Sequence, residues 1–131
     1  EVALLVATLK AKLGKDHWTE TENFKFVAEA PFDSDRKRMS TVYKRPDGTG
    51  FIMAKGAPES IVPLCTQILN KKCEPVEKSE ALVKKIEKAN VKLGEGGLRV
   101  LGLGVRELSS EEISAVDPND VEAVESKGQF V

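Results

Sequence analysis

Hydrophobic residues recur at two different periods along the first part of the chain. In residues 1–13 they lie three or four positions apart, which is the spacing of an amphipathic helix, and Gly14 is placed to end that helix in a left-handed cap. Residues 24–30 instead approximate a polar–apolar alternation, which predicts a strand that Pro31 ends. Residues 15–23, between the two, have no clear period and predict a connection with room for a short turn.

A β-hairpin is predicted from residue 38 to residue 55. Residues 38–44 alternate, and residues 45–50 read Arg-Pro-Asp-Gly-Thr-Gly, in which proline presets one φ angle and the Asp-Gly step allows a positive one. Residues 51–55 then return as the antiparallel partner strand. Alternation divides the first strand between two faces, with Met39, Thr41 and Tyr43 on one and Ser40 and Val42 on the other.

The second half of the chain predicts helices separated by short extended segments. Pro58 suits the first position of a helix and Glu59 suits the positive end of its dipole, so residues 57–65 are expected to be helical. Residues 79–93 carry an apolar stripe at helical spacing with lysines on the other face, and the glycines that follow end this helix. The remaining predicted elements are a buried strand at 98–105, a short acidic helix at 109–116, another at 120–125, and a strand beginning at 129.

Composition places the chain among ordinary globular domains and excludes several classes. Its 131 residues are enough for one domain with a hydrophobic core, and 40% are hydrophobic against 31% charged. The net charge of −1 offers no global attraction to nucleic acid or anionic lipid. No apolar run approaches the roughly 18 to 20 residues that cross a bilayer, so we expect no membrane insertion of this segment.

Few residues suggest catalysis or metal binding. His17, Cys65 and Cys73 have spacings unsuited to a metal site, and two cysteines are too few for a disulfide framework and suit a reducing cytosol. The sequence has no GxSxG elbow and no P-loop, and the glycine-rich run at 94–104 lacks the GxGxxG spacing of a dinucleotide site. We therefore predict neither catalytic residues nor metal ligands.

A local group of cations beside one aromatic residue is the strongest candidate for a binding site. Phe32 follows a proline that interrupts a strand, and the basic loop 36–38 comes next. Lys55 leads into Gly56, where a missing side chain would let a ligand approach the backbone, and Arg99 follows the glycine run at the start of another predicted strand. If these strands are neighbours, the ring and the cations converge on a site suited to a purine with a polyphosphate tail. The alternative from the residues alone is a buried Phe32 beside a solvated basic loop.

Two motifs resemble those of a known family. Residues 32–40, FDSDRKRMS, and residues 55–59, KGAPE, are similar to the nucleotide-binding domain of P-type cation-transporting ATPases, in particular the type II group that includes the calcium pumps. Glu1 with the two residues Ala3 and Leu4 matches the second half of the family's TExAL segment. With GLRVLGLGVRE at 97–107, the resemblance spans nearly the whole chain.

The resemblance implies a set of nucleotide-binding residues. Phe32 would stack on adenine, and Lys37 and Lys55 would line the pocket. Glu1 would approach the adenine amino group, and Arg99 would reach toward the phosphates. The remaining implied residues are Met39 and Leu101, as apolar walls, and Gly56, for close approach to the nucleotide.

The family also implies a fold and a role within a larger pump. We expect an α+β fold with a twisted antiparallel sheet flanked by helices. Since the sequence opens at Glu1 inside an apolar run, we expect a single nucleotide-binding domain, residues 1–131, cut from a larger membrane pump and lacking one edge of its sheet. The fragment would be monomeric and lie at the cytosolic face of the membrane.

In that pump the domain would bind ATP and release ADP, presenting the γ-phosphate to an aspartate of a separate phosphorylation domain. That aspartate lies in a DKTGT motif, which this sequence does not contain, so the fragment itself would not be catalytic. Mg²⁺ would accompany ATP, with its ligands outside the fragment. The phosphorylation and actuator domains of the same polypeptide would be its partners, and similarity at residues 32–40 favours calcium as the transported ion.

A protein-interaction module is the alternative function. In that interpretation the basic loop from Arg36 to Arg38 docks an acidic partner, and Phe32 is a contact anchor. The two functions differ in whether nucleotides perturb the residues around Phe32 and Lys55.

Overall fold

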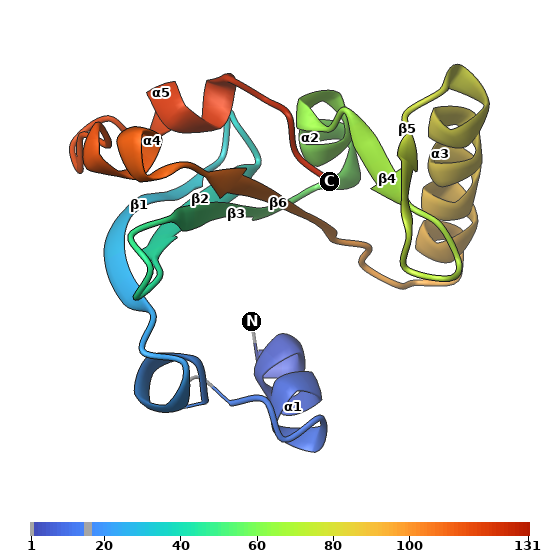
Figure 1. The fold of residues 1–131 in the computed structure, drawn as a ribbon. Helices are drawn as coiled ribbons and strands as arrows, with labels where there is room; N and C mark the ends of the chain where they lie inside the picture. The colour runs from blue at the N-terminus through green and yellow to red at the C-terminus, as the bar shows by residue number, and fades with distance from the viewer. Residues whose placement is uncertain (1, 15–16) are drawn as a thin grey trace.

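The computed structural model describes residues 2–14 and 17–131 and has an α+β fold (Figure 1). Its centre is a four-stranded antiparallel sheet in the order β1-β2-β3-β6, and a second sheet pairs β4 with β5. The strands are β1 (Lys25–Asp33), β2 (Arg38–Lys44), β3 (Gly50–Gly56), β4 (Gln67–Leu69), β5 (Pro75–Glu77) and β6 (Gly102–Leu108). The helices are α1 (Val2–Lys10), α2 (Pro58–Ile61), α3 (Glu80–Glu95), α4 (Ser110–Ser114) and α5 (Val121–Ser126), with a π-helical turn at His17–Thr21 and a 3₁₀ turn at Val62–Leu64.

The predicted hairpin is confirmed as β2 and β3. Its turn is closed by a hydrogen bond that Arg45 N donates to Thr49 O at 2.8 Å, and Gly48 takes a φ of +90°. The Asp47 carboxylate accepts from the hydroxyl of Thr49 at 2.7 Å and from its backbone N–H at 2.9 Å. These two bonds, the hydroxyl first, lower the pKa of Asp47 and hold the turn.

Helices cover only one face of the main sheet. In Figure 1, α2, α4 and α5 lie against one side, whereas α1 lies beyond the other. Ser40 and Val42 point to the covered face and are fully buried, as the alternation in β2 predicts. The same face of β3 and β6 contributes Ile52 and Leu108 to the core. We call the other side, with Met39, Thr41 and Tyr43 of β2, the open face.

The C-terminal residues complete the core beside β6. Phe130 has no solvent-exposed surface, and its carbonyl accepts from Thr66 N at 2.9 Å. Val131 and Val105 exchange two backbone hydrogen bonds, of 2.9 and 3.1 Å. The strand predicted from residue 129 is therefore reduced to a single bridge, between Phe130 and Cys65, and these backbone bonds.

Helix α1 ends earlier than predicted, at Lys10 rather than beside Gly14. Lys12 takes the left-handed conformation, with a φ of +58°, and donates to Leu9 O, while Leu13 N donates to Thr8 O. This pair of bonds is a Schellman cap, which a lysine provides here in place of glycine. No side chain of α1 is buried.

The predicted limits of two strands are wrong. Strand β1 continues past Pro31 to Asp33, because it is an edge strand in which the missing proline N–H breaks no ladder bond. Strand β6 begins at Gly102 rather than at residue 98 and continues to Leu108. Leu98 N instead donates to a carbonyl at the end of α3, which keeps this segment out of the sheet.

The helices of the second half are largely as predicted. The side-chain oxygens of Ser79, Ser109 and Asp120 accept N-cap bonds at the starts of α3, α4 and α5. The helix predicted at 57–65 is shorter, because α2 ends at Ile61 and a 3₁₀ turn containing Pro63 follows. The β4–β5 hairpin was not predicted, since strands of three residues are too short to show alternation.

Replacing Phe130 with alanine should destabilise the fold by about 3–5 kcal/mol, because the substitution leaves a cavity in the core. Urea denaturation followed by circular dichroism measures this change in the free energy of unfolding. Phe26, which is 55% exposed on β1, is the matched control, and Phe26→Ala should cost less than about 1.5 kcal/mol. Equal losses in the two variants would contradict the assigned core.

Candidate nucleotide-binding site

The open face of the sheet contains a pocket of about 400 Å³. Antiparallel pairing places Met39 opposite Lys55 and Lys55 opposite Leu103, so these three residues form a row across β2, β3 and β6. All three line the pocket, together with apolar side chains that include Met53 and Val105. The pocket thus combines apolar walls with the cationic side chain of Lys55.

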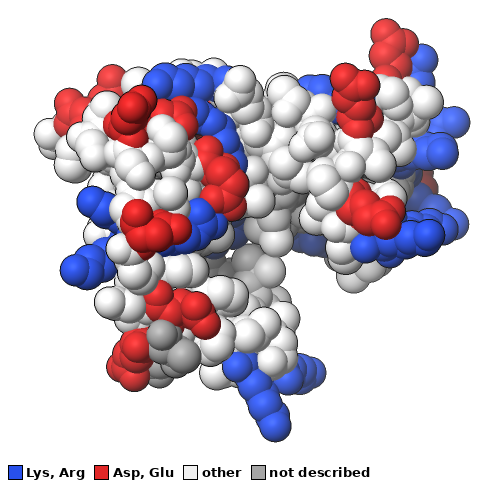
Figure 2. Space-filling model, in the orientation of Figure 1, with Lys and Arg blue, Asp and Glu red and all other residues white. Residues whose placement is uncertain are grey.

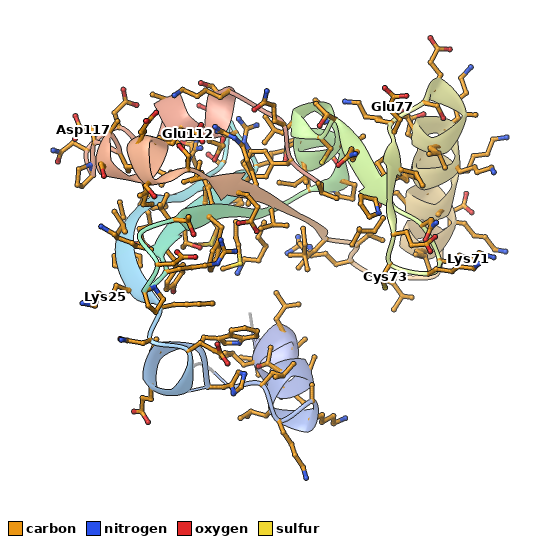
Figure 3. All side chains as sticks on the ribbon, in the orientation of Figure 1. Lys25, Lys71, Cys73, Glu77, Glu112 and Asp117 are labelled. Carbon is orange, nitrogen blue, oxygen red and sulfur yellow. The ribbon has the colours of Figure 1, made fainter. Side chains whose placement is uncertain are left out.

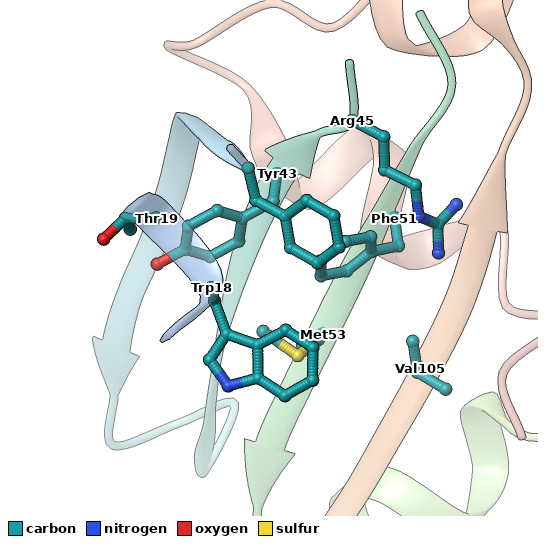
Figure 4. A pocket seen from close by; sticks show the side chains of 8 residues that line it. Trp18, Thr19, Tyr43, Arg45, Phe51, Met53 and Val105 are labelled. Carbon is teal, nitrogen blue, oxygen red and sulfur yellow. The ribbon is translucent and has the colours of Figure 1, made fainter. Parts of the chain in front are cut away.

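A second pocket, of about 440 Å³, adjoins the first and shares Met53 and Val105 with it (Figure 4). Its wall is aromatic: the rings of Tyr43 and Phe51 stack with centroids 5.8 Å apart, and Phe51 also meets Phe24 edge to face at 5.4 Å. The two pockets make one apolar surface along the open face. Sequence analysis missed this aromatic wall, although the alternation already placed Tyr43 on the open face.

Arg45 lies at the edge of the aromatic wall. Its guanidinium is 4.8 Å from the centroid of the Phe51 ring, in cation–π geometry. It also pairs with Glu107, with one hydrogen bond of 2.9 Å, and this pairing raises the pKa of Arg45. Glu107 therefore already balances the charge of Arg45.

Phe32 projects from the edge strand β1 and is 64% exposed. The register between β1 and β2 is irregular between Ala30 and Asp33, which is where Phe32 lies. The alternative in which Phe32 belongs to the core is therefore wrong, and the ring is accessible to a ligand.

Local hydrogen bonds to the carboxylate and the carbonyl of Asp33 help to hold the turn after Phe32. The Asp33 carboxylate accepts from Arg36 N at 2.8 Å and from Asp35 N at 2.9 Å, and these bonds, that of Arg36 first, lower the pKa of Asp33. Lys37 N donates to Asp33 O at 2.7 Å, and Lys37 takes a φ of +53°. The exposed side chain of Lys37 approaches Glu59, with Nζ and Oε1 3.6 Å apart.

The two arginines of the basic loop point into the covered face rather than to solvent. The side chains of Arg36 and Arg38 are only 16% and 20% exposed, and both pair with Glu125 on α5. Lys37 is the exposed member of the three. This arrangement is unfavourable to a partner that docks on the loop through all three cations.

Figure 2 shows that charges of both signs are mixed over the α4–α5 side, while basic residues gather near α3.

Gly56 is explained by chain packing. It pairs with Arg38 in β2, and a Cβ atom at Gly56 would lie 2.4 Å from the Lys37 carbonyl oxygen. The same carbonyl accepts from Ala57 N at 3.0 Å. The missing side chain thus lets the end of β3 approach the turn that carries Lys37, which is a different reason from the ligand approach expected from the sequence.

The other predicted site residues are less closely grouped. Leu101 is partly exposed and directly precedes Gly102, which pairs with Gly56 in β3. Arg99 is exposed in the segment between α3 and β6, and it has no hydrogen bond or ion pair within residues 2–14 and 17–131. Glu1 lies outside the described residues. Of the predicted site residues, the structure therefore brings Met39 and Lys55 together in the pocket on adjacent strands, while Leu101 and Arg99 lie in the segment before β6 and do not line it.

The residues considered for metal binding are scattered. Cys65 is buried, and burial raises the pKa of its thiol. Cys73 is exposed on the β4–β5 turn (Figure 3), and His17 contacts the Trp18 ring. Among the described residues, no three His, Cys, Asp or Glu side chains are grouped as a metal site would require.

Comparison with known proteins gives the family. The whole chain, residues 1–131, matches the P-type ATPase cytoplasmic domain N, and the chain belongs to this family. It is 37% identical over 114 residues to a calcium-transporting ATPase of Bacillus cereus, an alignment that covers 86% of this chain and 12% of that protein. It is 33% identical over 131 residues to a sodium/potassium exporting P-type ATPase of Schizosaccharomyces pombe, covering 100% of this chain and 12% of that protein.

The chain therefore spans about an eighth of the length of these relatives, 12% in each case. A calcium-transporting ATPase of Listeria monocytogenes is similar as well, at 29% identity over 124 residues. Within the described part of the chain, none of the helices has the length and apolar character needed to span a bilayer.

The Asp33 carboxyl should titrate below 3.8, its ordinary value, because the backbone N–H groups of Arg36 and Asp35 favour its charged form. A pKa that is lower in the folded state than in the unfolded state stabilises the fold above the unfolded value, and this contribution is lost as the pH falls through the folded value. Carbon-detected NMR titration of the carboxyl measures the midpoint, and Asp33→Asn should remove that resonance and reduce acid destabilisation below pH 3.8. A midpoint at or above 3.8 would refute the turn geometry.

Proposed function

We propose that this chain binds ATP through its adenine as the nucleotide-binding domain of a cation-transporting P-type ATPase. The observation that carries the proposal is the row of Met39, Lys55 and Leu103 in a pocket on the open face, near the sheet edge where Phe32 is exposed. Adenine is flat, uncharged and apolar on both faces, whereas its phosphate tail is anionic. An apolar pocket that contains one lysine suits a ligand with both properties.

Phe32 and Lys37 supply the second half of the proposed site. The exposed ring of Phe32 would stack on the purine, an interaction worth about 1–3 kcal/mol. Lys37 and Lys55 would then lie beside the nucleotide, with Met39 and Leu101 as apolar walls. Because solvent screens the contact that the exposed Lys37 can make and one ring supplies most of the stacking, we expect the isolated chain to bind with a Kd of roughly 0.1–1 mM.

In the proposed parent pump, the domain presents the γ-phosphate of ATP to an aspartate on a separate phosphorylation domain. Lys37, Lys55 and Arg99 are the residues of this chain that would hold the nucleotide, with Glu1 at the adenine amino group. Mg²⁺ bound to ATP supplies charge neutralisation during phosphoryl transfer. The whole chain forms one domain of the pump at the cytosolic face of the membrane, working with the phosphorylation and actuator domains, and on its own it is monomeric and does not turn over ATP.

The ion moved by the parent is proposed from the relatives and from one motif. The similar proteins are named as calcium-transporting or sodium/potassium exporting ATPases, which supports cation transport as the parent's activity. Similarity of residues 32–40 to the calcium pumps favours calcium. The substitution Phe32→Ala tests whether the chain binds nucleotide, and this test does not depend on which cation is transported.

Phe32→Ala should weaken AMP binding by at least about fivefold, because the variant loses the stacking ring. Titration of the labelled chain with AMP, followed by the amide signals around Phe32 and Lys55, measures the Kd. Phe26→Ala, which removes an exposed ring at the other end of β1, is the matched control and should bind as the wild type does. If the wild type shows no shifts at these residues, the nucleotide function is refuted and the interaction module becomes the better interpretation.

Arg99→Ala should weaken ATP binding by about two- to fivefold more than AMP binding, because an exposed arginine contributes through charge attraction to the β- and γ-phosphates. The ratio of the two Kd values from parallel NMR titrations measures the effect. Lys92→Ala, which removes an exposed cation from α3, controls for the general loss of positive charge. Equal losses for the two nucleotides in Arg99→Ala would contradict the phosphate role.

A further inference from the structure

The buried carboxylate of Glu125, on α5, bonds to side chains of the turn between β1 and β2 and of β2 itself. Glu125 is 1% exposed, and its two oxygens each accept from Arg36 Nη1 at 3.1 Å. Arg38 Nε donates to one of these oxygens, and the Ser40 hydroxyl donates to the other. The partners are 85 to 89 positions away in the sequence, so Glu125 joins the end of the chain to the turn between β1 and β2.

Arg36 also bonds to the residues on either side of the exposed Phe32. Besides Glu125, its guanidinium donates to the carbonyl oxygen of Pro31 at 2.9 Å, and Pro31 is the residue before Phe32. The backbone N–H of Arg36 donates to the Asp33 carboxylate in the same turn. Arg36 therefore links α5 to the residues on both sides of Phe32, to the Pro31 carbonyl through its side chain and to the Asp33 carboxylate through its backbone N–H.

The turn needs such a restraint because one of its residues is in an uncommon conformation. Lys37 has a φ of +53°, which is uncommon for a residue other than glycine. Its carbonyl is fixed from the β3 side, accepting from Ala57 N at 3.0 Å and from Ser60 Oγ at 3.2 Å. Glu125 fixes the opposite side of the turn through Arg36 and Arg38.

We propose that Glu125 is a positioning residue that holds Phe32 and Lys37 in the arrangement that binds the nucleotide. This inference rests on the proposed function of the same site. Glu125 does not touch the ligand, since it is buried beneath the covered face, while Phe32 and Lys37 project to the surface. Without Glu125, the turn samples other conformations. The apparent Kd then equals the intrinsic Kd divided by the fraction of chains that keep the competent conformation.

Glu125→Gln tests the inference, because glutamine keeps the size of the side chain and removes the charge that pairs with both arginines. We expect a weakening of AMP binding by about fivefold, as for a competent fraction of roughly one fifth. Amide hydrogen exchange at Lys37, whose N–H is bonded to Asp33 O, should accelerate more than exchange at Val105, whose N–H is bonded to Val131 O. This difference separates release of the turn from a general loss of stability.

Glu112→Gln is the matched control. Glu112, at the start of α4 (Figure 3), pairs with the buried Arg106 of β6 beneath the same sheet, away from the β1–β2 turn. The Glu112 side chain is 36% exposed against 1% for Glu125, but its variant likewise loses the charge that pairs with a buried arginine. Stability should therefore fall while the Kd for AMP stays within about twofold of the wild type, because the competent fraction of the site is unchanged. Arg36→Lys, which keeps the charge and loses the paired geometry, gives the same test if Glu125→Gln does not fold.

Three results would overturn the inference. The first is a folded Glu125→Gln or Arg36→Lys chain that binds AMP as the wild type does. The second is equal weakening by Glu125→Gln and Glu112→Gln, which would indicate a general effect of stability. The third is a wild-type chain that does not bind AMP, which refutes the proposed function itself and is recognised because the failure precedes any substitution.

Discussion

Antiparallel pairing of β2 with β3 and of β3 with β6 determines which side chains can meet on the open face. The register places Met39, Lys55 and Leu103 in one row, although they come from three separate segments of the sequence. A shift of β3 by one residue against β2 would turn Lys55 into the core and bring Ala54 to the surface, and a shift of β6 would remove Leu103 from the row. The Asp47–Thr49 turn, which sets the length of the hairpin, therefore also determines the composition of the pocket.

The covered face buries charged side chains beside apolar ones, so its charges must be paired within the protein. Arg36 and Arg38 meet Glu125, and Arg106 meets Glu112, so each of these three arginines has an anionic partner. Ion pairs of this kind contribute little net stability, since desolvation offsets much of the attraction between the charges. Their geometry is the more important property: a paired guanidinium has few alternative positions, and the backbone around it is fixed as a result.

Local patterns in the sequence predicted the elements that depend on local interactions. The alternation in β2, the Asp-Gly turn and the helices that begin near residues 79, 109 and 120 each depend on interactions within a few positions, and these elements are confirmed. Pairing within the sheet decided the limits of β1 and β6, which periodicity alone placed wrongly. An edge position makes Pro31 acceptable in a strand, and no pattern within residues 24–30 reveals that position.

In the candidate site, too, local sequence patterns identified some residues, whereas those that depend on contacts between distant segments were missed. The alternation put Met39 on its correct face, and the residue pattern singled out Phe32 and Lys55. Glu125 was not singled out, because a glutamate in a short acidic helix normally faces solvent and its partners lie 85 to 89 positions earlier. The basic loop was misleading for the same reason: only the fold reveals that two of its three cations point inward.

The covered face buries ion pairs beside an apolar core, whereas the open face leaves apolar side chains in contact with solvent, which supports a ligand there. Charged residues lie beneath α5 and α4, whereas Met53, Leu103 and Val105 are left partly exposed on the open face. A contiguous apolar surface of this kind is typical of an interaction site, since leaving it in water has a free-energy cost. In the proposed complex a purine would cover only part of such a surface, so we expect weak and reversible binding. The proposed restraint of Phe32 and Lys37 from the covered face would then matter more, because a weak ligand contributes little free energy to order its own site.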